Sequence, residues 1–182
     1  MMAKGMKIGA AVCTALTVLF ACLHLEGLTI TAGTFAYHLL MRLAVGYVFD
    51  KTLNNRVDYH QPWFRMRAFE AKLYEKLRVA RWKAGMPTYD PDAFDRHKHS
   101  WEEIVQAMCQ AEWVHEVIVL LSFLPIAAAP WLGGWAAFVI TSLLAAGFDM
   151  MFVIMQRYNR PRVMKIVERM KQRKEDGWRE DS

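Results

Sequence analysis

Residues 135–155 read WAAFVITSLLAAGFDMMFVIM, an apolar stretch whose one ionisable side chain is Asp149. A helix of this length and composition can cross the roughly 30 Å hydrocarbon core of a membrane. Three further apolar segments precede it, at residues 8–23, 28–49 and 113–131. The sequence therefore predicts an all-α fold, with one membrane domain over residues 1–182 that is a bundle of about four transmembrane helices.

The composition also favours a membrane protein. Hydrophobic residues make up 54% of the 182-residue chain and charged residues 23%, but the two classes form separate blocks. Soluble helices and strands would mix them at periods of 3.6 or 2. The net charge of +5 therefore indicates contact with anionic membrane lipids and not with nucleic acid. The three cysteines have no motif spacing, so we expect Cys13, Cys22 and Cys109 to be free thiols.

The first apolar segment follows Lys4 and Lys7 and resembles a signal peptide as well as a transmembrane helix. The second segment begins only five residues after Leu23, at Leu28. Such a short link favours a retained helix that forms a hairpin with the second segment.

The distribution of lysine and arginine predicts the orientation of the chain. The links between segments one and two and between segments three and four contain neither residue. Residues 51–112 contain eleven, and the tail after Met155 contains nine. Positively charged residues collect on the cytoplasmic side of membrane proteins. We therefore expect a multi-pass protein of the cell membrane with a cytoplasmic region at 50–112, a basic cytoplasmic tail at 156–182 and both termini in the cytoplasm.

Within the cytoplasmic region, apolar residues recur at helical spacing among lysines and arginines. They are Trp63, Met66, Phe69, Leu73, Leu77 and Ala80. This pattern predicts one amphipathic helix from Trp63 to Lys83, ended by Gly85 and Pro87. The helix would lie in the membrane interface or pack on its own domain, and the sequence does not decide between the two.

Another helix is predicted to start at residues 100–103, where Ser100 and Glu103 have the spacing of a capping box. It has no breaker before Pro125, so it should continue into the third apolar segment. Glu112 and His115 then share one face at the cytoplasmic mouth of that segment. His115 is the best candidate base, because histidine titrates near neutral pH, and Glu112 could fix its tautomer. The alternative is an ordinary interfacial polar pair.

The fourth segment ends in a polar heptapeptide, Gln156-Arg157-Tyr158-Asn159-Arg160-Pro161-Arg162. Dense hydrogen-bonding capacity at a membrane boundary suits a ligand that carries phosphate or carbonyl groups. Tyr158 and Asn159 could donate to an oxyanion, and Arg157, Arg160 and Arg162 could hold phosphates. The alternative for the arginines is a stop-transfer signal in contact with lipid.

Ionisable side chains also occur inside the predicted spans, at His38, Arg42 and Asp149. Such residues are costly in a membrane and usually face the bundle interior or water. We expect an ion pair between Arg42 and Asp149, which would be structural or would line the site.

The heptapeptide resembles the signature that closes the glycosyl-4,4'-diaponeurosporenoate acyltransferase family, small membrane enzymes of carotenoid glycolipid synthesis. Two further blocks fit this family in order: Arg81-Trp82-Lys83 followed by Pro87, and Ala111-Glu112-Trp113-Val114-His115. The resemblance covers roughly residues 73–174. It implies transfer of a fatty acyl group from acyl-CoA or another acyl thioester to a hydroxyl of a lipid or glycolipid acceptor at the inner leaflet.

This resemblance also implies a site. Its catalytic residues would be His115, Glu112, Asn159 and Tyr158. Its substrate-binding residues would be Arg157, Arg160, Arg162, Gln156, Lys83 and Trp82. To these we add the ionisable residues inside the predicted spans as candidate substrate-binding residues: His38, Arg42 and Asp149. The partners would be membrane lipids, the acceptor and the acyl donor, with no bound cofactor or metal and no nucleic acid.

Two other functions remain open from the sequence. One is a non-enzymatic scaffold or accessory subunit that binds anionic lipid, and the other is a different lipid-modifying enzyme on the same fold. A nucleophile elbow, a P-loop and a dinucleotide fingerprint are all absent from the sequence. The sequence does not indicate the oligomeric state.

Overall fold

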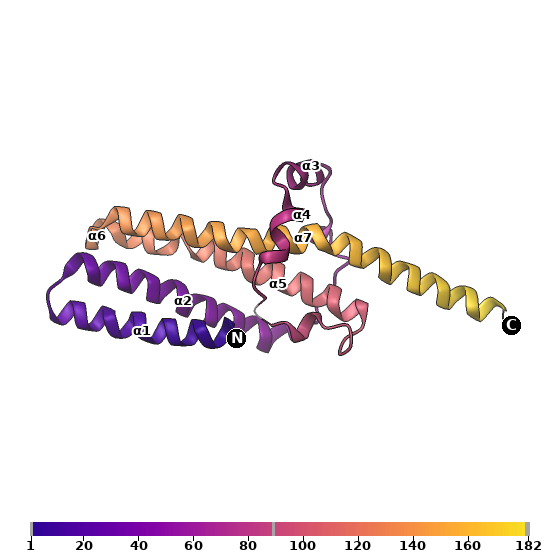
Figure 1. Ribbon diagram of the computed structural model, residues 1–182, viewed down its shortest axis with the longest axis horizontal. Helices are drawn as coiled ribbons and strands as arrows, with labels where there is room; N and C mark the ends of the chain where they lie inside the picture. Colours follow the sequence, from indigo (N-terminus) through magenta and orange to yellow (C-terminus); the bar gives the residue numbers. More distant parts are fainter. Residues whose placement is uncertain (1, 89, 181–182) are drawn as a thin grey trace. The chain divides into compact units, whose positions relative to one another are not determined.

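A computed structural model describes residues 2–88 and 90–180, and it describes the side chains from Lys4 to Asp176 apart from that of Tyr89. The long helices are α1 (Met2–Cys22), α2 (Glu26–Leu53), α5 (Trp101–Leu121) and α7 (Trp135–Glu180). The shorter ones are η1 (Pro62–Phe64), α3 (Ala68–Lys76), α4 (Val79–Trp82), η2 (Lys83–Gly85), η3 (Asp92–Phe94), η4 (Leu124–Ala128) and α6 (Ala129–Leu132). The described residues contain no strand, which confirms the all-α prediction (Figure 1).

The chain forms two compact units. The first, called here the bundle unit, consists of Met1–Thr52 and Trp113–Phe152. The second, called the polar unit, consists of Leu53–Glu112 and Val153–Ser182. Helices α5 and α7 contribute residues to both.

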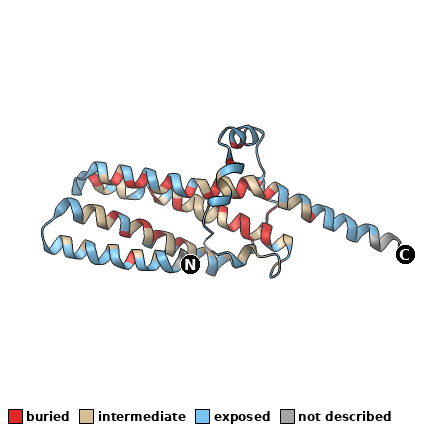
Figure 2. Ribbon diagram, in the orientation of Figure 1, coloured by how far each residue is buried: buried red, intermediate tan, exposed pale blue. Residues whose placement is uncertain are grey.

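Four stretches are long and apolar enough to cross a membrane: Lys4–Cys22, Glu26–Leu53, Trp101–Leu132 and Trp135–Asp176. They cover the four apolar segments that the sequence predicted, apart from Leu23 at the end of the first. Helix α1 is mostly exposed, and its residues Ile8, Val12 and Val18 each expose more than half of their surface (Figure 2). An apolar surface of this extent is rare on a soluble monomer and typical of a membrane-facing one.

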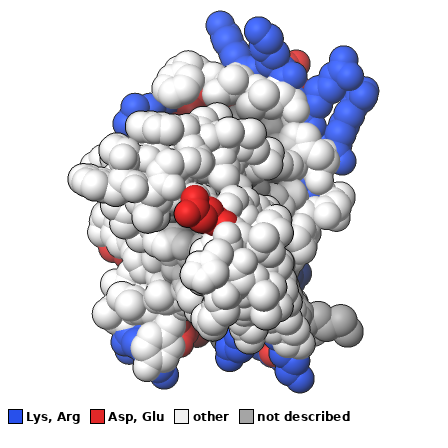
Figure 3. Space-filling view, turned by 90° about the vertical axis from the view of Figure 1, so that its left-hand side faces the viewer, with Lys and Arg blue, Asp and Glu red and all other residues white. Residues whose placement is uncertain are grey.

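Helices α1 and α2 form the expected hairpin and lie side by side (Figure 1). Two glycines let them approach: a Cβ on Gly33 would lie 3.4 Å from Thr17 Cγ2, and one on Gly9 would lie 3.3 Å from Leu39 Cδ1. Small residues commonly allow such contacts between membrane helices. In the view toward the turn between α1 and α2, lysine and arginine side chains appear only near the edges (Figure 3).

The core of the bundle unit joins α2 to the second half of α5. Met41, Val45 and Ile118 are buried there, and a ring of partly buried apolar side chains packs against them. The Tyr37 hydroxyl donates a hydrogen bond of 2.9 Å to the Leu121 carbonyl. This contact satisfies one of the carbonyls that the end of α5 would otherwise leave without a partner.

The third apolar segment, predicted at 113–131, is not one continuous helix. Helix α5 ends at Leu121, and the segment continues as η4 and α6. Pro125 lies in the first turn of η4, and it lacks the N–H group that an α-helix would need at that position. Gly133 and Gly134 follow with φ angles of 70° and 66°, a backbone conformation that favours glycine, and they reverse the chain into α7.

The prediction of one helix from Trp63 to Lys83 is wrong. The segment contains α3 and α4, with a 3-10 turn before α3 and another after α4. Arg78 separates the two α-helices with a φ angle of 53°, in the left-handed conformation that ends many helices. The apolar stripe at Phe69, Leu73 and Leu77 is real but exposed, while the buried side of α3 carries Glu70 and Tyr74.

The predicted start of α5 is confirmed. Ser100 Oγ accepts a hydrogen bond from the Glu103 amide at 3.2 Å, and Glu103 Oε2 accepts one from the Ser100 amide at 2.7 Å. The two residues thus form the reciprocal capping box. The basic stretch after the fourth segment is helical as well, because α7 continues to Glu180.

Candidate functional site

Three helices of the bundle unit bring charged side chains together. Asp149 of α7 is only 1% exposed, and its Oδ2 forms an ion pair with Arg42 Nη2 of α2. Its other oxygen, Oδ1, lies 2.9 Å from His115 Nδ1 of α5. The Arg42–Asp149 pair that the sequence predicted is therefore present, and it is joined to His115.

Backbone carbonyls hold Arg42 in place. Arg42 Nη1 donates to the His38 carbonyl at 2.9 Å, and Nη2 donates to the Ala145 carbonyl at 3.2 Å. A buried carboxylate is stable only when it is paired and hydrogen-bonded. Arg42 supplies that pairing to Asp149 and fixes its orientation.

The imidazole of His115 is constrained on its face and at one nitrogen. Its ring stacks on Phe152 at a centroid distance of 4.5 Å and an interplanar angle of 6°. When Nδ1 carries the proton and donates to the Asp149 carboxylate, Nε2 of the neutral ring has a free lone pair. The side chain remains 16% exposed. This arrangement can accept a proton at Nε2.

The prediction that Glu112 orients His115 is wrong. Glu112 belongs to the polar unit, where it is completely buried. Its Oε1 accepts a hydrogen bond from Arg157 Nη1 at 2.6 Å, and its Oε2 pairs with Arg160 Nη1. Two guanidinium groups stabilise this carboxylate, because a buried charge requires a compensating one.

Arg157 and Arg160 are tied into the same buried network. Arg157 also pairs with Glu70 at 2.7 Å and donates to the carbonyls of residues 63 and 65. Arg160 donates to the Phe64 carbonyl at 2.5 Å. These contacts hold residues 63–65 and α3 against α7. They favour a structural role over the predicted contact with phosphate.

Lys83, Tyr158, Asn159 and Arg162 form a second cluster in the polar unit, called here the cationic cluster. Lys83 Nζ donates to Asn159 Oδ1 at 2.6 Å, and Arg162 Nη2 donates to the Tyr158 hydroxyl at 2.7 Å. Both cations also lie over the Tyr158 ring, at 4.9 Å and 4.2 Å from its centroid. Among the described contacts of these four residues there is no carboxylate. The cluster is therefore electropositive and suited to an anion.

Tyr74 extends this cluster from α3, with its ring 6.2 Å from that of Tyr158 in a T-shaped arrangement. Burial raises the pKa of Tyr74 to about 12, so its phenol stays neutral beside the two cations.

The other predicted site residues have no described contact with His115, Asp149 or the cationic cluster. Trp82 Nε1 donates to the Leu77 carbonyl at the end of α3, and Gln156 is buried in the polar unit. His38 is buried in the bundle unit, and neither of its ring nitrogens has a hydrogen-bond partner among the described residues. Glu70 was not predicted from the sequence, because no spacing distinguishes it from the other charged residues of 63–83.

Comparison with known families gave one result. The model of a family described as glycosyl-4,4'-diaponeurosporenoate acyltransferase matches residues 60–169. This range contains His115, Asp149 and the cationic cluster, whereas His38 and Arg42 precede it. Searches of curated proteins and of solved structures found no match.

Proposed function

The chain belongs to the glycosyl-4,4'-diaponeurosporenoate acyltransferase family, and on that premise we propose that it moves a fatty acyl group from an acyl thioester to a hydroxyl of a lipid or glycolipid acceptor. Membership makes the chain an acyltransferase of the carotenoid glycolipid class and sets aside the scaffold alternative. The observation that carries the proposed chemistry is the hydrogen bond between His115 and Asp149.

His115 is the proposed general base. Its Nε2 takes the proton of the acceptor hydroxyl while the hydroxyl oxygen attacks the thioester carbonyl and forms the new C–O bond. Collapse of the tetrahedral intermediate breaks the C–S bond, and the imidazolium returns the proton to the departing thiolate. The products are an ester and a free thiol, so the step needs no further reactant.

Asp149 acts through His115 as a positioning residue. Its carboxylate selects the tautomer with the proton on Nδ1 and stabilises the imidazolium that forms during attack. The ion pair with Arg42 compensates the charge of this carboxylate, which is almost completely buried. Arg42 therefore supports catalysis without touching the substrates.

The cationic cluster is the proposed site for the anionic part of the acyl donor. Since Asn159 Oδ1 accepts from Lys83, the amide NH₂ group of Asn159 is directed away from Lys83 and can donate. Tyr158 accepts from Arg162 and retains its own O–H as a donor. Lys83 and Arg162 replace Arg157 and Arg160 as the proposed phosphate-binding cations, because the latter two are used in buried ion pairs.

We also propose that the four apolar stretches cross the membrane, with both termini cytoplasmic and the site at the inner leaflet. Support comes from their length and hydropathy and from the lysines and arginines that collect at residues 51–112 and after Met155.

Reconstitution of the purified chain tests the proposed reaction. Vesicles that contain the protein and a glycolipid acceptor should, after addition of acyl-CoA, yield an acylated glycolipid and one free thiol per ester, measured by mass spectrometry and a thiol reagent. Free fatty acid in place of acyl-CoA should give no product. Equal product from free fatty acid would contradict the thioester chemistry.

A further inference from the structure

The surface of the polar unit over residues 63–81 carries many cations and few carboxylates. Six basic side chains are exposed there: Arg65, Arg67, Lys72, Lys76, Arg78 and Arg81. The two acidic residues of this range are Glu75, which is exposed, and Glu70, which is buried and paired with Arg157. None of the six cations forms an ion pair with a described carboxylate. The exposed charge of this surface is therefore strongly positive and is not compensated by the described part of the chain.

Large apolar side chains lie beside these cations on α3. Phe69 and Leu73 are one turn apart and expose 59% and 41% of their surface. Lys72 follows Phe69 by three residues, and Lys76 follows Leu73 by three. Side chains three or four residues apart are neighbours on a helix, so an apolar row and a basic row run side by side along α3. The exposed surface of α3 is thus amphipathic in itself.

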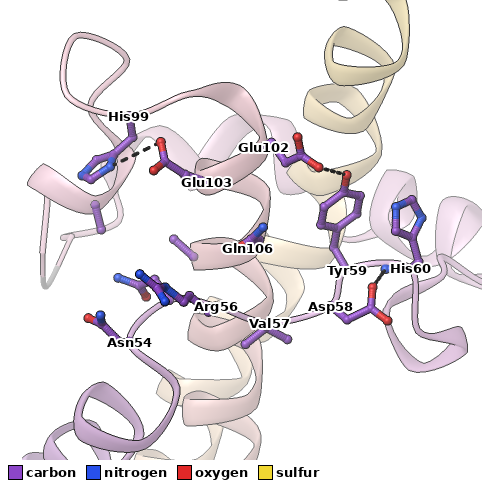
Figure 4. Close-up of a pocket in the computed structure, with 13 residues that line it drawn as sticks. Asn54, Arg56, Val57, Asp58, Tyr59, His60, His99, Glu102, Glu103 and Gln106 are labelled. Carbon is purple, nitrogen blue, oxygen red and sulfur yellow. Dashed lines mark hydrogen bonds and ion pairs between the residues drawn. The ribbon is translucent and has the colours of Figure 1, made fainter. Parts of the chain in front are cut away.

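Carboxylates of the polar unit collect at a different place. A pocket between the loop that follows α2 and the first turns of α5 is lined by Asp58, Glu102 and Glu103 (Figure 4). Among the described lining residues, Arg56 is the one lysine or arginine, and α3 and α4 contribute none of them. The polar unit therefore separates its charges, with an excess of cations at residues 65–81 and several carboxylates around the start of α5.

This combination matches the interface of a bilayer that contains anionic lipid. Large apolar side chains enter the boundary between headgroups and acyl chains, and neighbouring lysines extend their charged ends to the lipid phosphates. An anionic membrane surface attracts basic segments and repels carboxylates, so the separated charges of the polar unit would also orient it. A soluble acidic protein could pair with the cations, but it would need an apolar groove shaped to Phe69 and Leu73. A bilayer covers these side chains without any shape complementarity.

We propose that the polar unit binds anionic phospholipid headgroups at the membrane interface through the exposed cations of residues 65–81 and the apolar side chains of Phe69, Leu73 and Leu77. These residues are called here the docking surface. The phosphates of the lipid pair with the cations, and the apolar side chains enter the layer beneath the headgroups.

The docking surface is distinct from the cationic cluster. Lys83 and Arg162 of that cluster contact Asn159 and Tyr158, and neither cation belongs to the docking surface. Lipid binding and donor binding therefore use different charges. The inference goes beyond acyl transfer, and lipid binding is measurable without any reaction.

Hydrogen exchange of the full chain in lipid nanodiscs tests the docking surface. The amides of residues 68–81 should exchange at least about threefold more slowly with about 30% phosphatidylglycerol than in pure phosphatidylcholine, because each basic residue near an anionic surface strengthens binding about fivefold. The difference should become smaller in about 1 M salt, which screens the charges. Residues 103–110 of α5 lie outside the docking surface and should exchange equally in both lipids.

Lys72→Gln with Lys76→Gln should weaken docking about 20- to 30-fold and so remove most of the effect of phosphatidylglycerol. The matched control, Arg173→Gln with Lys174→Gln, removes the same charge from exposed positions of α7 and should retain the effect.

Equal exchange of the wild type in the two lipids, or a full effect of phosphatidylglycerol in the Lys72 and Lys76 variant, would overturn the proposal. So would slower exchange that requires an added acidic protein, such as acyl carrier protein, in phosphatidylcholine nanodiscs. Lys83→Met should retain the lipid effect, and its loss in that variant would assign the lipid to the cationic cluster. Each of these outcomes is independent of whether the chain makes an acylated product.

Discussion

Asp149 Oδ1 lies 2.9 Å from His115 Nδ1, so the carboxylate that orients this histidine comes from α7 and not from the preceding turn of α5. This contact joins α5 to α7 within the bundle unit and links a proton-accepting ring to a buried ion pair with Arg42.

Asp149→Asn tests this relationship. The asparagine has the same shape but can donate to Nδ1, which would place the proton on Nε2 and remove the base. Loss of tautomer control costs on the order of 10⁴-fold in a serine protease triad, and we expect kcat to fall at least about 10²-fold with little change in either KM. Initial rates of ester formation in vesicles measure both. A kcat near the wild-type value would show that Asp149 only pairs with Arg42.

Glu112→Gln should affect folding more than chemistry. Removing one partner of a buried ion pair typically costs about 3–5 kcal/mol, and here it would leave Arg160 without its carboxylate. We expect a clear drop in the thermal unfolding temperature, with activity lost in proportion to unfolded protein. The exposed Glu75→Gln on α3 is the matched control. A stable but inactive Glu112→Gln protein would instead point to a catalytic carboxylate.

Lys83→Met and Arg162→Gln should weaken binding of the acyl donor. A hydrogen bond to a charged group contributes about 1.5–3 kcal/mol, so the KM for acyl-CoA should rise about 10-fold or more in each variant. Lys72→Met, on the exposed surface of α3, should leave this KM unchanged. The assignment fails if the KM for the acceptor rises instead while that for the donor stays constant.

The orientation in the membrane is tested with reporter fusions. Reporters placed within residues 90–96 and after Ser182 should both be active in the cytoplasm, since positive charge is concentrated in these regions. Protease protection of sealed vesicles provides an independent measurement. An external signal at either position would reverse the proposed topology.

The exposed apolar stripe of α3 predicts contact with lipid. Leu73→Asp with Leu77→Asp should preserve the unfolding temperature, because both side chains are already exposed, and should ease extraction of the protein from vesicles. Leu73→Ala with Leu77→Ala is a milder control. A strong loss of stability in the aspartate variant would show that the stripe packs on the protein.

Much of the fold was predictable because membrane spans and helix caps leave local signals. The four apolar segments required only length and composition, and the capping box at Ser100 required only spacing. The Arg42–Asp149 pair followed from the cost of isolated charges in a membrane. Each of these predictions depends on the composition or spacing of a single segment, or on two opposite charges that must be paired in an apolar environment.

Other features were not predictable, because they depend on tertiary contacts. Glu112 and His115 share a helical spacing, but each takes its partner from α7, and spacing alone does not reveal that. The break at Arg78 has no glycine or asparagine to mark it, so the apolar stripe indicated one helix where there are two.

The role of His115 as the base is tested by the single-turnover rate of ester formation by folded His115→Ala in vesicles. We expect an unfolding temperature close to that of the wild type, intact binding of acyl-CoA and a rate lower by about 10²-fold or more, because a positioned base has been lost. His115→Gln should not restore the rate, because its amide cannot take a proton. A His115→Ala rate within a few-fold of the wild type would contradict the assignment of His115 as the base.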